Sequence, residues 1–271
     1  GYMAKKDNST KNYRAYLDRK CLPQLREILT NYGKIALIWF DTPMGTTPEE
    51  SREMAELVKE LQPDCIVSGR IGNGLGEYMT TGDNFIPRLP YEGDWEVPAT
   101  LNDTWGFNKD DHNWKSAAEI IPLLVKINSR GGNYLLNIGP DGTGKVPEES
   151  VAILNEVGSY VSANQEAIFA TKRMPMYPYE LTWGDLTCKE HHLYVHVFRK
   201  IPRVEVLGFN NTPKRAYLVE TGEELEYKRS RTCEGDEYIT VELPKGYQEK
   251  EFYCIGIEFE EEMPVFAPIN E

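Results

Sequence analysis

Several carboxylates of this sequence stand where acid–base chemistry is commonly built. Asp41 comes directly after the apolar run Ile35–Trp39, and α/β folds place their chemistry just past the carboxyl ends of buried parallel strands. Two carboxylates that face each other beside tryptophans can cleave a glycosidic bond, because one attacks the anomeric carbon while the other protonates the leaving oxygen. More acids follow in the chain, and we expect them to converge with Asp41 at one rim: Asp83, Glu92, Asp94 and Glu96.

Each of these residues also has a purely structural interpretation. Asp41 precedes a Thr-Pro-Met turn and could simply cap that turn or the following helix. Arg70, which follows the next predicted strand, could form an ordinary strand-end salt bridge. The neighbour of Glu96, Trp95, could exclude water from the carboxyl and so raise its pKa. A general acid that works near neutral pH needs such a raised pKa.

The elements that must position these residues alternate between helix and strand. Apolar spacing, N-cap residues and N-terminal prolines predict the helices, and short apolar runs predict the strands. The repeated alternation predicts a parallel sheet with barrel-like architecture. Because Ile35–Trp39 lacks a polar break, we expect that strand to be buried on both faces. The predicted helices are Tyr13–Tyr32, Pro48–Leu61, Trp114–Ser129 and Pro147–Asn164, and the other strands are Cys65–Ser68, Ala99–Asn102 and Asn133–Ile138.

Two connections between these strands bear on function. Residues 82–98 form a long predicted loop that holds the later acids, and loops of this length in a compact domain are usually functional. An earlier loop holds Gly72, Gly74 and Gly76. Their spacing differs from the G-x-G-x-x-G of dinucleotide-binding folds, and no helix start follows to hold a phosphate. We therefore do not predict nucleotide binding.

After Thr171 the pattern changes to short segments of alternating apolar and polar residues. Turn residues separate them, which predicts an antiparallel β-sandwich. Met174–Tyr179 is the predicted linker or first edge. The sequence thus divides into a barrel-like domain, 1–171, and a sandwich domain, 172–271, in which we find no catalytic constellation. The predicted sandwich strands are Leu193–Phe198, Arg203–Leu207, Ala216–Val219, Tyr238–Leu243 and Tyr253–Phe259.

Composition excludes several classes of partner. With 30 basic and 43 acidic residues the formal net charge is −13. No run of Lys or Arg interleaved with aromatic residues occurs, so we expect neither nucleic acid nor an anionic membrane surface as a partner. No apolar run approaches the about 18 residues of a membrane span, and the first residues lack the core of a signal peptide.

Cysteines and histidines give no metal-binding pattern. The five cysteines are scattered and lack C-x-x-C spacing, so we expect mostly buried free thiols, with one disulfide in the C-terminal region left open. His191, His192 and His196 lie close in sequence, but no Cys or carboxylate stands at matching spacing. We interpret them as residues of a surface strand, and we expect no metal ion and no cofactor.

Four motifs, taken in order, resemble a known enzyme family. They are W-F-D at Trp39–Asp41, W-E at Trp95–Glu96, T-W-G-F at Thr104–Phe107 and G-G-N-Y-L-L-N-I-G-P at Gly131–Pro140. Together they resemble the second half of the family 29 glycoside hydrolases, the retaining α-L-fucosidases. The last motif is the most specific because of its length. The resemblance runs from about Tyr13 to Asn164, and the predicted sandwich matches that family's C-terminal domain in kind.

The resemblance implies roles for the motif residues. Asp41 corresponds to the family's nucleophile and Glu96 to its acid/base, with Glu92 as the alternative acid/base. The implied activity is exo-acting removal of terminal α-L-fucose from glycans by double displacement, through a covalent glycosyl-enzyme on Asp41. The resemblance also implies sugar-binding residues, which are Arg70, Trp39, Trp95, Trp105 and Phe107. Arg70 would contact the sugar or orient the nucleophile, and Trp105 and Phe107 would form part of an apolar wall for the fucose methyl group.

The family uses a (β/α)8 TIM-like barrel, of which this sequence would contain about the second half. We count about four predicted strand–helix units, and half a barrel leaves two open sheet edges. We therefore expect the 271 residues to be the C-terminal part of a longer enzyme that needs its N-terminal half. A fucosylated glycan is the implied substrate. The oligomeric state stays open, and a periplasmic, lysosomal or secreted location suits glycan trimming.

Two other functions stay open on the sequence. A non-catalytic carbohydrate-binding protein would keep the same fold without turnover. A retaining glycosidase for a related sugar such as galactose would share the carboxylates and differ at the apolar wall near Phe107.

Overall fold

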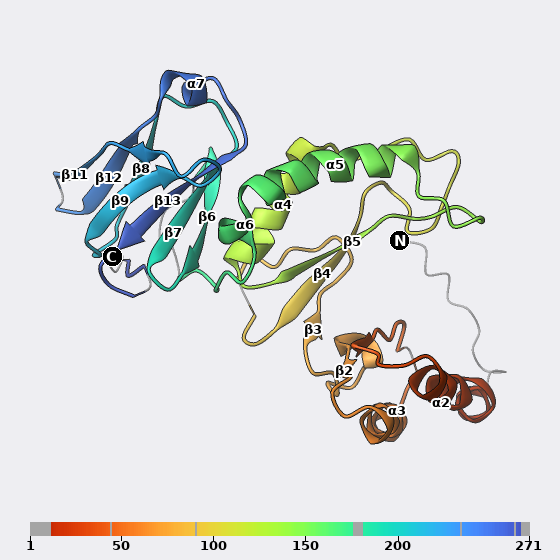
Figure 1. The fold of residues 1–271 in the computed structure, drawn as a ribbon. Coiled ribbons are helices and arrows are strands. Elements are labelled where there is room, and N and C mark those ends of the chain that lie inside the picture. The colour runs from red at the N-terminus through yellow and green to blue at the C-terminus, as the bar shows by residue number, and fades with distance from the viewer. Residues whose placement is uncertain are drawn as a thin grey trace. The chain divides into compact units, whose positions relative to one another are not determined.

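The computed structural model describes residues 12–43, 45–89, 91–175, 181–233, 235–262 and 264–266. Contacts divide the chain into two compact units, residues 1–80 with 93–95 and residues 81–92 with 96–271. Figure 1 labels the elements in chain order. The predicted domain boundary between 171 and 172 lies inside the second unit and stays a prediction. Most of the predicted linker, Met174–Tyr179, lies outside the described residues.

The first unit begins with a continuous helical segment, as the apolar spacing predicts. It comprises α1 (Tyr13–Tyr16), a π-helical stretch (Leu17–Cys21) and α2 (Leu22–Asn31). Gly33 follows with a φ of 83°, a left-handed conformation that favours glycine just past a helix end. The buried side chains of this segment, among them Leu17, pack with those of the next helix, so the two helices share one core.

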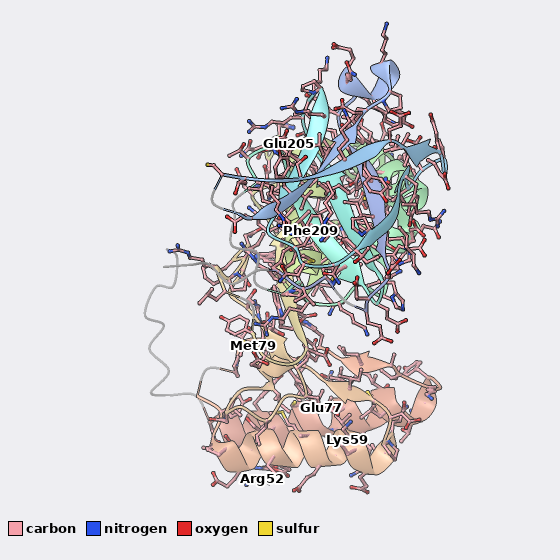
Figure 2. All side chains as sticks on the ribbon, turned by 90° about the vertical axis from the view of Figure 1, so that its left-hand side faces the viewer. Arg52, Lys59, Glu77, Met79, Glu205 and Phe209 are labelled. Atoms are coloured by element: carbon pink, nitrogen blue, oxygen red, sulfur yellow. The ribbon has the colours of Figure 1, made fainter. Side chains whose placement is uncertain are left out.

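The next helix, α3 (Pro48–Leu61), begins and ends at the predicted residues. The Thr47 hydroxyl accepts a hydrogen bond from the backbone N–H of Glu50, whose carboxylate accepts one from the N–H of Thr47. This capping box satisfies two donors at the helix start. Near the other end Lys59 Nζ lies 2.8 Å from Glu77 Oε2 (Figure 2), and the same carboxylate accepts from the backbone of Val67 at 2.7 Å.

Two short strands, β1 (Leu37–Ile38) and β2 (Ile66–Val67), pair in parallel. The expectation that Ile35–Trp39 forms a strand buried on both faces was wrong, because the run is half-buried, with one exposed residue. Among the described residues β1 pairs only with β2, so one of its edges lacks a covering strand there. A 3₁₀ turn (Gly69–Ile71) follows β2, and β3 (Met79–Thr80) comes after the glycine-rich loop.

A second parallel pair is formed by β4 (Trp95–Thr100) and β5 (Asn133–Asn137). Helix α4 (Ala117–Ser129) connects these strands, and α5 (Glu148–Ala163) and α6 (Gln165–Ile168) follow β5. Apolar side chains of α4 and α5 form a common core. The strand–helix–strand–helix order predicted for this part of the chain is confirmed.

Strand β4 begins four residues earlier than predicted, which moves Glu96 out of the long loop. All six residues of β4 are buried, and Glu96 is its second residue. Pro98 suggested a break in the sequence, because proline lacks a donor for the strand ladder. In the structure the Pro98 carbonyl accepts from the Asn84 N–H at 2.8 Å, on the side away from β5. The proline nitrogen shares that side, so the β4–β5 ladder loses no donor.

The C-terminal part forms two antiparallel sheets, drawn from cyan to blue in Figure 1. The five-stranded sheet has the order β10-β9-β13-β7-β6, and the three-stranded sheet has the order β11-β12-β8. Five strands were predicted to within a few residues, whereas β6, β10 and β11 were missed. The bounds are β6 Gly184–Lys189, β7 His192–Val197, β8 Arg203–Leu207, β9 Pro213–Leu218, β10 Glu224–Leu225, β11 Tyr227–Arg231, β12 Glu237–Glu242 and β13 Tyr253–Phe259, with a short α7 at Lys245–Gln248.

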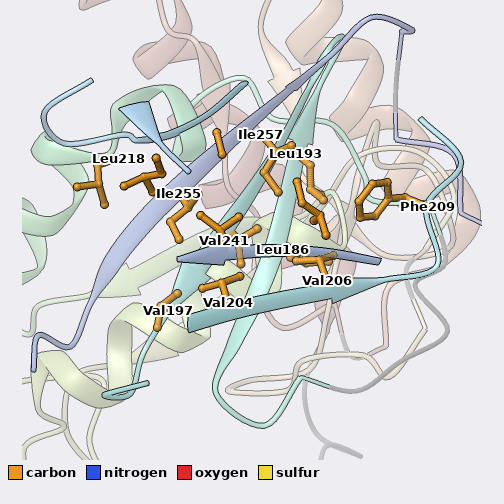
Figure 3. Close-up of a cluster of buried hydrophobic side chains, with 14 of the residues drawn as sticks. Leu186, Leu193, Val197, Val204, Val206, Phe209, Leu218, Val241, Ile255 and Ile257 are labelled. Atoms are coloured by element: carbon orange, nitrogen blue, oxygen red, sulfur yellow. The ribbon is translucent and has the colours of Figure 1, made fainter. Parts of the chain in front are cut away.

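One apolar core lies between these two sheets. Figure 3 shows Val206 and Val241 of the smaller sheet in the same cluster as Leu193 and Ile257 of the larger one. Alternating side chains of each strand point into this layer, as a sandwich requires. The antiparallel sandwich predicted from the alternation is therefore present.

The surface position expected for His196 was wrong, because its side chain is fully buried. Its Nδ1 lies 2.6 Å from the Tyr160 hydroxyl of α5, and its Nε2 lies 2.9 Å from Thr187 Oγ1 of β6. Thr187 donates its own proton to the Ala167 carbonyl of α6 at 2.7 Å, so it accepts from Nε2–H. The face of β7 that carries His196 is covered by these helices, which the sequence pattern of the strand alone does not reveal.

All five cysteines are free thiols, so the disulfide left open for the C-terminal region is not formed. Three of them are buried, one is half-buried and Cys233 is exposed. None of the described helices is both long and apolar enough to cross a membrane.

Candidate functional site

Asp41 and Arg70 both follow parallel strands of the first unit. The backbone N–H of Ser68 donates to the Ile38 carbonyl at 3.2 Å, and that of Phe40 donates to Ser68 Oγ at 2.8 Å. These bonds extend the β1–β2 pairing beyond its last ladder residues. They bring the residues after each strand to the same end of the pair, which is where parallel strands carry functional side chains.

Asp41, Arg70 and Trp39 form one contact group at this end. Arg70 Nη1 donates to Asp41 Oδ1 at 3.1 Å, and the Arg70 guanidinium lies over the Trp39 ring, 5.0 Å from its centroid. The Asp41 side chain is 55% exposed, whereas that of Arg70 is 19% exposed. The indole therefore orients the guanidinium, and the guanidinium holds a carboxylate that solvent and ligand can reach.

The loops that hold this group are tightly built. Thr42, directly after Asp41, has a φ of 58°, a left-handed conformation that is unusual for threonine. A Cβ on Gly76 would lie 2.5 Å from the Gly69 Cα, so the glycines allow the loop to pack on the turn that carries Arg70. The sequence pattern gave this loop no role, and close backbone packing explains its glycines.

Ser51 and Asn73 are positioning residues that sequence reasoning missed. The buried Ser51 hydroxyl, on α3, donates to the Ile71 carbonyl at 2.9 Å. Asn73 donates to that hydroxyl at 2.9 Å and to the Thr46 carbonyl at 3.1 Å. Together they join α3, the loop after Asp41 and the loop after Arg70. A serine inside an otherwise apolar helix face was the one signal that could have found them.

In the second unit, Glu96 is 9% exposed and lies at the start of β4. Its backbone carbonyl accepts from Thr81 at 3.0 Å. The neighbouring Trp95 is 1% exposed, so its ring belongs to the interior. Trp95 and Glu96 are the first two residues of β4, so they lie at the amino end of a parallel strand. The side chains of α/β active sites gather at the carboxyl end.

The alternative acid, Glu92, lies on the surface. Its side chain is 92% exposed and its Oε1 lies 2.8 Å from Arg173 Nη1. Ion pairs of this kind between exposed groups contribute little to stability, on the order of 0–1 kcal/mol.

Asp83 is exposed and directly precedes Asn84, which bonds to the second half of β4. The next residue, Asn84, donates its backbone N–H to the Pro98 carbonyl and accepts from the Thr100 N–H at 3.1 Å. Of the acids predicted to converge, Asp83 is the one whose next residue forms hydrogen bonds with the last residues of this strand.

Trp105 and Phe107 follow the same end of β4, and both rings are exposed. The Trp105 carbonyl accepts from Asn137 Nδ2 at the end of β5 at 2.6 Å. A Cβ on Gly139 would lie 3.2 Å from that carbonyl. The N-I-G part of the ten-residue motif therefore holds the aromatic loop against the strand end. Among the described residues no group of three or more His, Cys, Asp or Glu could hold a metal ion.

A sequence model described as alpha-L-fucosidase matches residues 1–166. The chain belongs to the α-L-fucosidase family. Among curated members, an alpha-L-fucosidase of Dictyostelium discoideum is 30% identical over 167 residues, which are 58% of this chain and 36% of that protein. The chain thus spans little more than a third of this relative's length.

Solved structures of the family resemble both described units. Alpha-L-fucosidase from Vibrio sp. strain EJY3 superposes with a TM-score of 0.82 at 30% identity, covering 96% of this chain and 48% of that one. An alpha-L-fucosidase from Lactobacillus casei, in complex with α-L-fucose product, is 38% identical, with a TM-score of 0.54, 59% of this chain and 49% of that one.

Proposed function

We propose that the chain supplies the nucleophile and part of the sugar pocket of a retaining, exo-acting α-L-fucosidase. The observation that carries this proposal is Asp41, whose exposed carboxylate follows a parallel strand and accepts a hydrogen bond from Arg70. A carboxylate in this setting suits attack on an anomeric carbon. Family membership and the fucose-bound relative support the substrate class, terminal α-L-fucose on a glycan.

In the first step of the proposed reaction, a carboxylate oxygen of Asp41 bonds to the anomeric carbon. The bond from that carbon to the leaving oxygen breaks, and the acid/base gives this oxygen its proton. In the second step the acid/base takes a proton from water, whose oxygen displaces Asp41 and releases fucose. Arg70 positions Asp41 for attack. Trp39, Trp105 and Phe107 contribute sugar contacts, the last two as the wall for the fucose methyl group.

The acid/base is proposed to come from the acids of residues 83–96. Glu96 is the residue that the family motif indicates, with Glu92 as its alternative. The local geometry favours Asp83 over both, because it is exposed and accompanies the carboxyl end of β4. Glu96 is 9% exposed at the opposite end of the strand. Trp95 is 1% exposed, so its ring is not proposed to contact the sugar directly.

We also propose that the parallel pairs β1–β2 and β4–β5 belong to one (β/α)8 barrel and that residues 172–271 form its C-terminal sandwich domain. Two observations support this. Both pairs are parallel with helices between consecutive strands, and one edge of β1 lacks a neighbouring strand among the described residues. The remaining strands of the barrel would cover that edge.

Hydrolysis of an aryl α-L-fucoside by the complete protein tests the proposal, with Asp41→Gly as the variant. We expect turnover to fall by several orders of magnitude, while fucose still binds, because the variant removes the attacking carboxylate and leaves the proposed sugar contacts in place. Wild-type protein that binds fucose without turnover would make this a carbohydrate-binding protein. Faster hydrolysis of the aryl galactoside would reassign the sugar.

Azide rescue identifies the acid/base, because azide attacks the glycosyl-enzyme in place of water in the second step and, being an anion, needs no general base. The variants are Asp83→Ala, Glu92→Ala and Glu96→Ala, assayed on an aryl fucoside with a good leaving group. We expect azide to restore turnover at least tenfold, with formation of a fucosyl azide, in Asp83→Ala alone. Rescue of Glu96→Ala instead would support the motif assignment and contradict the geometric one.

A further inference from the structure

The second unit contains a large pocket that the proposed reaction does not use. Its volume is about 890 Å³, within the range of small-molecule sites. It lies between α4, the start of β6, the end of β7 and the segment that carries Arg88 and Leu89. Every lining residue that the structure describes belongs to the second unit.

The charge of this pocket is opposite to that of the chain. The chain has 30 basic and 43 acidic residues, yet among the described residues the pocket is lined by five cations and one carboxylate, Asp185. A concave wall that collects charges of one sign focuses their field and attracts a ligand of the other sign. The five cations are Arg88, Lys126, Arg130, Arg173 and Arg199.

Local structural roles account for three of the cations. Arg173 pairs with Glu92, and Arg130 donates to the Pro87 carbonyl at 2.7 Å. Lys126 lies in the last turn of α4, where a positive charge favours the helix dipole. Arg88 and Arg199 come from two other segments, and neither forms an ion pair with another residue that the structure describes. They are the guanidinium groups left to bind a ligand.

An apolar wall accompanies these charges. The rings of Phe198 and Phe252, which both line the pocket, lie with their centroids 6.1 Å apart. Phe252 has a φ of 57°, a strained conformation for an aromatic residue that concentrates at functional sites. Leu89 also lines the pocket, and its side chain is exposed. The site thus combines apolar contact area with charge.

We propose that this pocket binds an organic anion. Its carboxylate, sulfate or phosphate group is held by Arg88 and Arg199, and its apolar part lies against Phe198 and Phe252. Guanidinium groups match such oxyanions because their planar donors bind two oxygens at once. Asp185 repels the ligand's negative charge, so the affinity is lower than five cations alone would give.

Isothermal titration calorimetry of the complete protein with three probes tests the proposal. Phenyl sulfate carries the charge and a ring, inorganic sulfate carries the charge alone, and benzyl alcohol carries the ring alone. We expect phenyl sulfate to bind at least tenfold more tightly than either of the others, with an affinity that falls as salt is added. If inorganic sulfate bound more tightly than phenyl sulfate, the pocket would bind anions without using its apolar wall, and the proposal of an organic ligand would be overturned.

Charge variants locate the site. Arg88→Ala and Arg199→Ala should each weaken phenyl sulfate about tenfold, since each removes a charged hydrogen-bond donor. Asp185→Asn should strengthen it severalfold, because it removes an opposing charge and keeps an acceptor oxygen for the Leu186 N–H. The matched control is Lys228→Ala, an exposed cation of β11. Equal weakening by the control, or unchanged binding in both arginine variants with wild-type melting temperatures, would overturn the proposal.

Discussion

At the scale of single residues, the contact between Arg70 and Asp41 joins side chains 29 positions apart. The sequence predicted Asp41 as a site residue because it follows an apolar strand, whereas the role of Arg70 was implied by the family resemblance. Contact with the nucleophile was one of the two roles implied for Arg70, but the sequence did not show that the Trp39 ring would support the guanidinium. That contact depends on the pairing of β1 with β2, which fixes where the residues after each strand emerge. Strand bounds also decide the exposure of the acids, because Glu96 is buried within β4 whereas Asp83 is exposed in a preceding segment.

Replacing Arg70 by methionine tests its positioning role. Methionine keeps an apolar contact with Trp39 but neither donates to Asp41 nor carries charge. We expect kcat on an aryl fucoside to fall about a hundredfold with a smaller change in KM, as for loss of one preorganised donor. Arg14→Met is the control, because Arg14 pairs with Asp18 and Glu53 outside the site. A rise in KM with unchanged kcat would show that Arg70 binds sugar and does not position the nucleophile.

At the scale of elements, the sequence predicted helices better than strands. Caps and apolar periodicity are local, so α3 and the ends of α5 followed from the sequence. The errors in β1 and β4 arose because the local sequence does not show which segments pair with these strands. Strand β1 is half-buried because one edge lacks a partner in the described chain, and Pro98 is tolerated because its nitrogen faces away from β5.

His196 shows the same limit, because helices from a distant part of the chain decide its burial. Tyr160, Thr187 and Ala167 complete a chain of hydrogen bonds around the neutral ring. Burial lowers the pKa of His196 from 6.5 to about 3. These bonds therefore join α5 and α6 to the larger sheet of the sandwich only while the ring stays unprotonated.

This burial predicts a loss of stability in acid. Below pH 6.5 the unfolded chain binds a proton at His196 that the folded protein excludes until about pH 3. The free energy of unfolding should therefore fall as pH drops from 6.5 towards 3, by up to about 1.4 kcal/mol per pH unit from this residue. Urea unfolding at several pH values measures it. His196→Gln should flatten the slope, whereas His112→Gln, in an exposed loop, should not. Equal slopes in wild type and His196→Gln would contradict the assignment.

At the scale of the whole molecule, the family explains why two parallel pairs and a sandwich occur in one chain. The sequence predicted the order of these parts from a change of periodicity near residue 171, and both kinds of sheet are present. The barrel itself is a proposal, because parallel pairing is local and closure needs every strand. The chain spans 36% of the length of its Dictyostelium relative, so the enzymatic activity is likewise a proposal.

The most direct test of the account is to trap the glycosyl-enzyme. A 2-fluoro-fucosyl fluoride slows the second step more than the first, so a retaining enzyme accumulates the covalent intermediate. After incubation with the complete protein and proteolysis, peptide mass spectrometry should find one fluorofucosyl group on Asp41 and none on Asp41→Gly. A label on another carboxylate, or continued turnover of an aryl fucoside in the Asp41→Gly variant, would contradict the claim that Asp41 is the nucleophile.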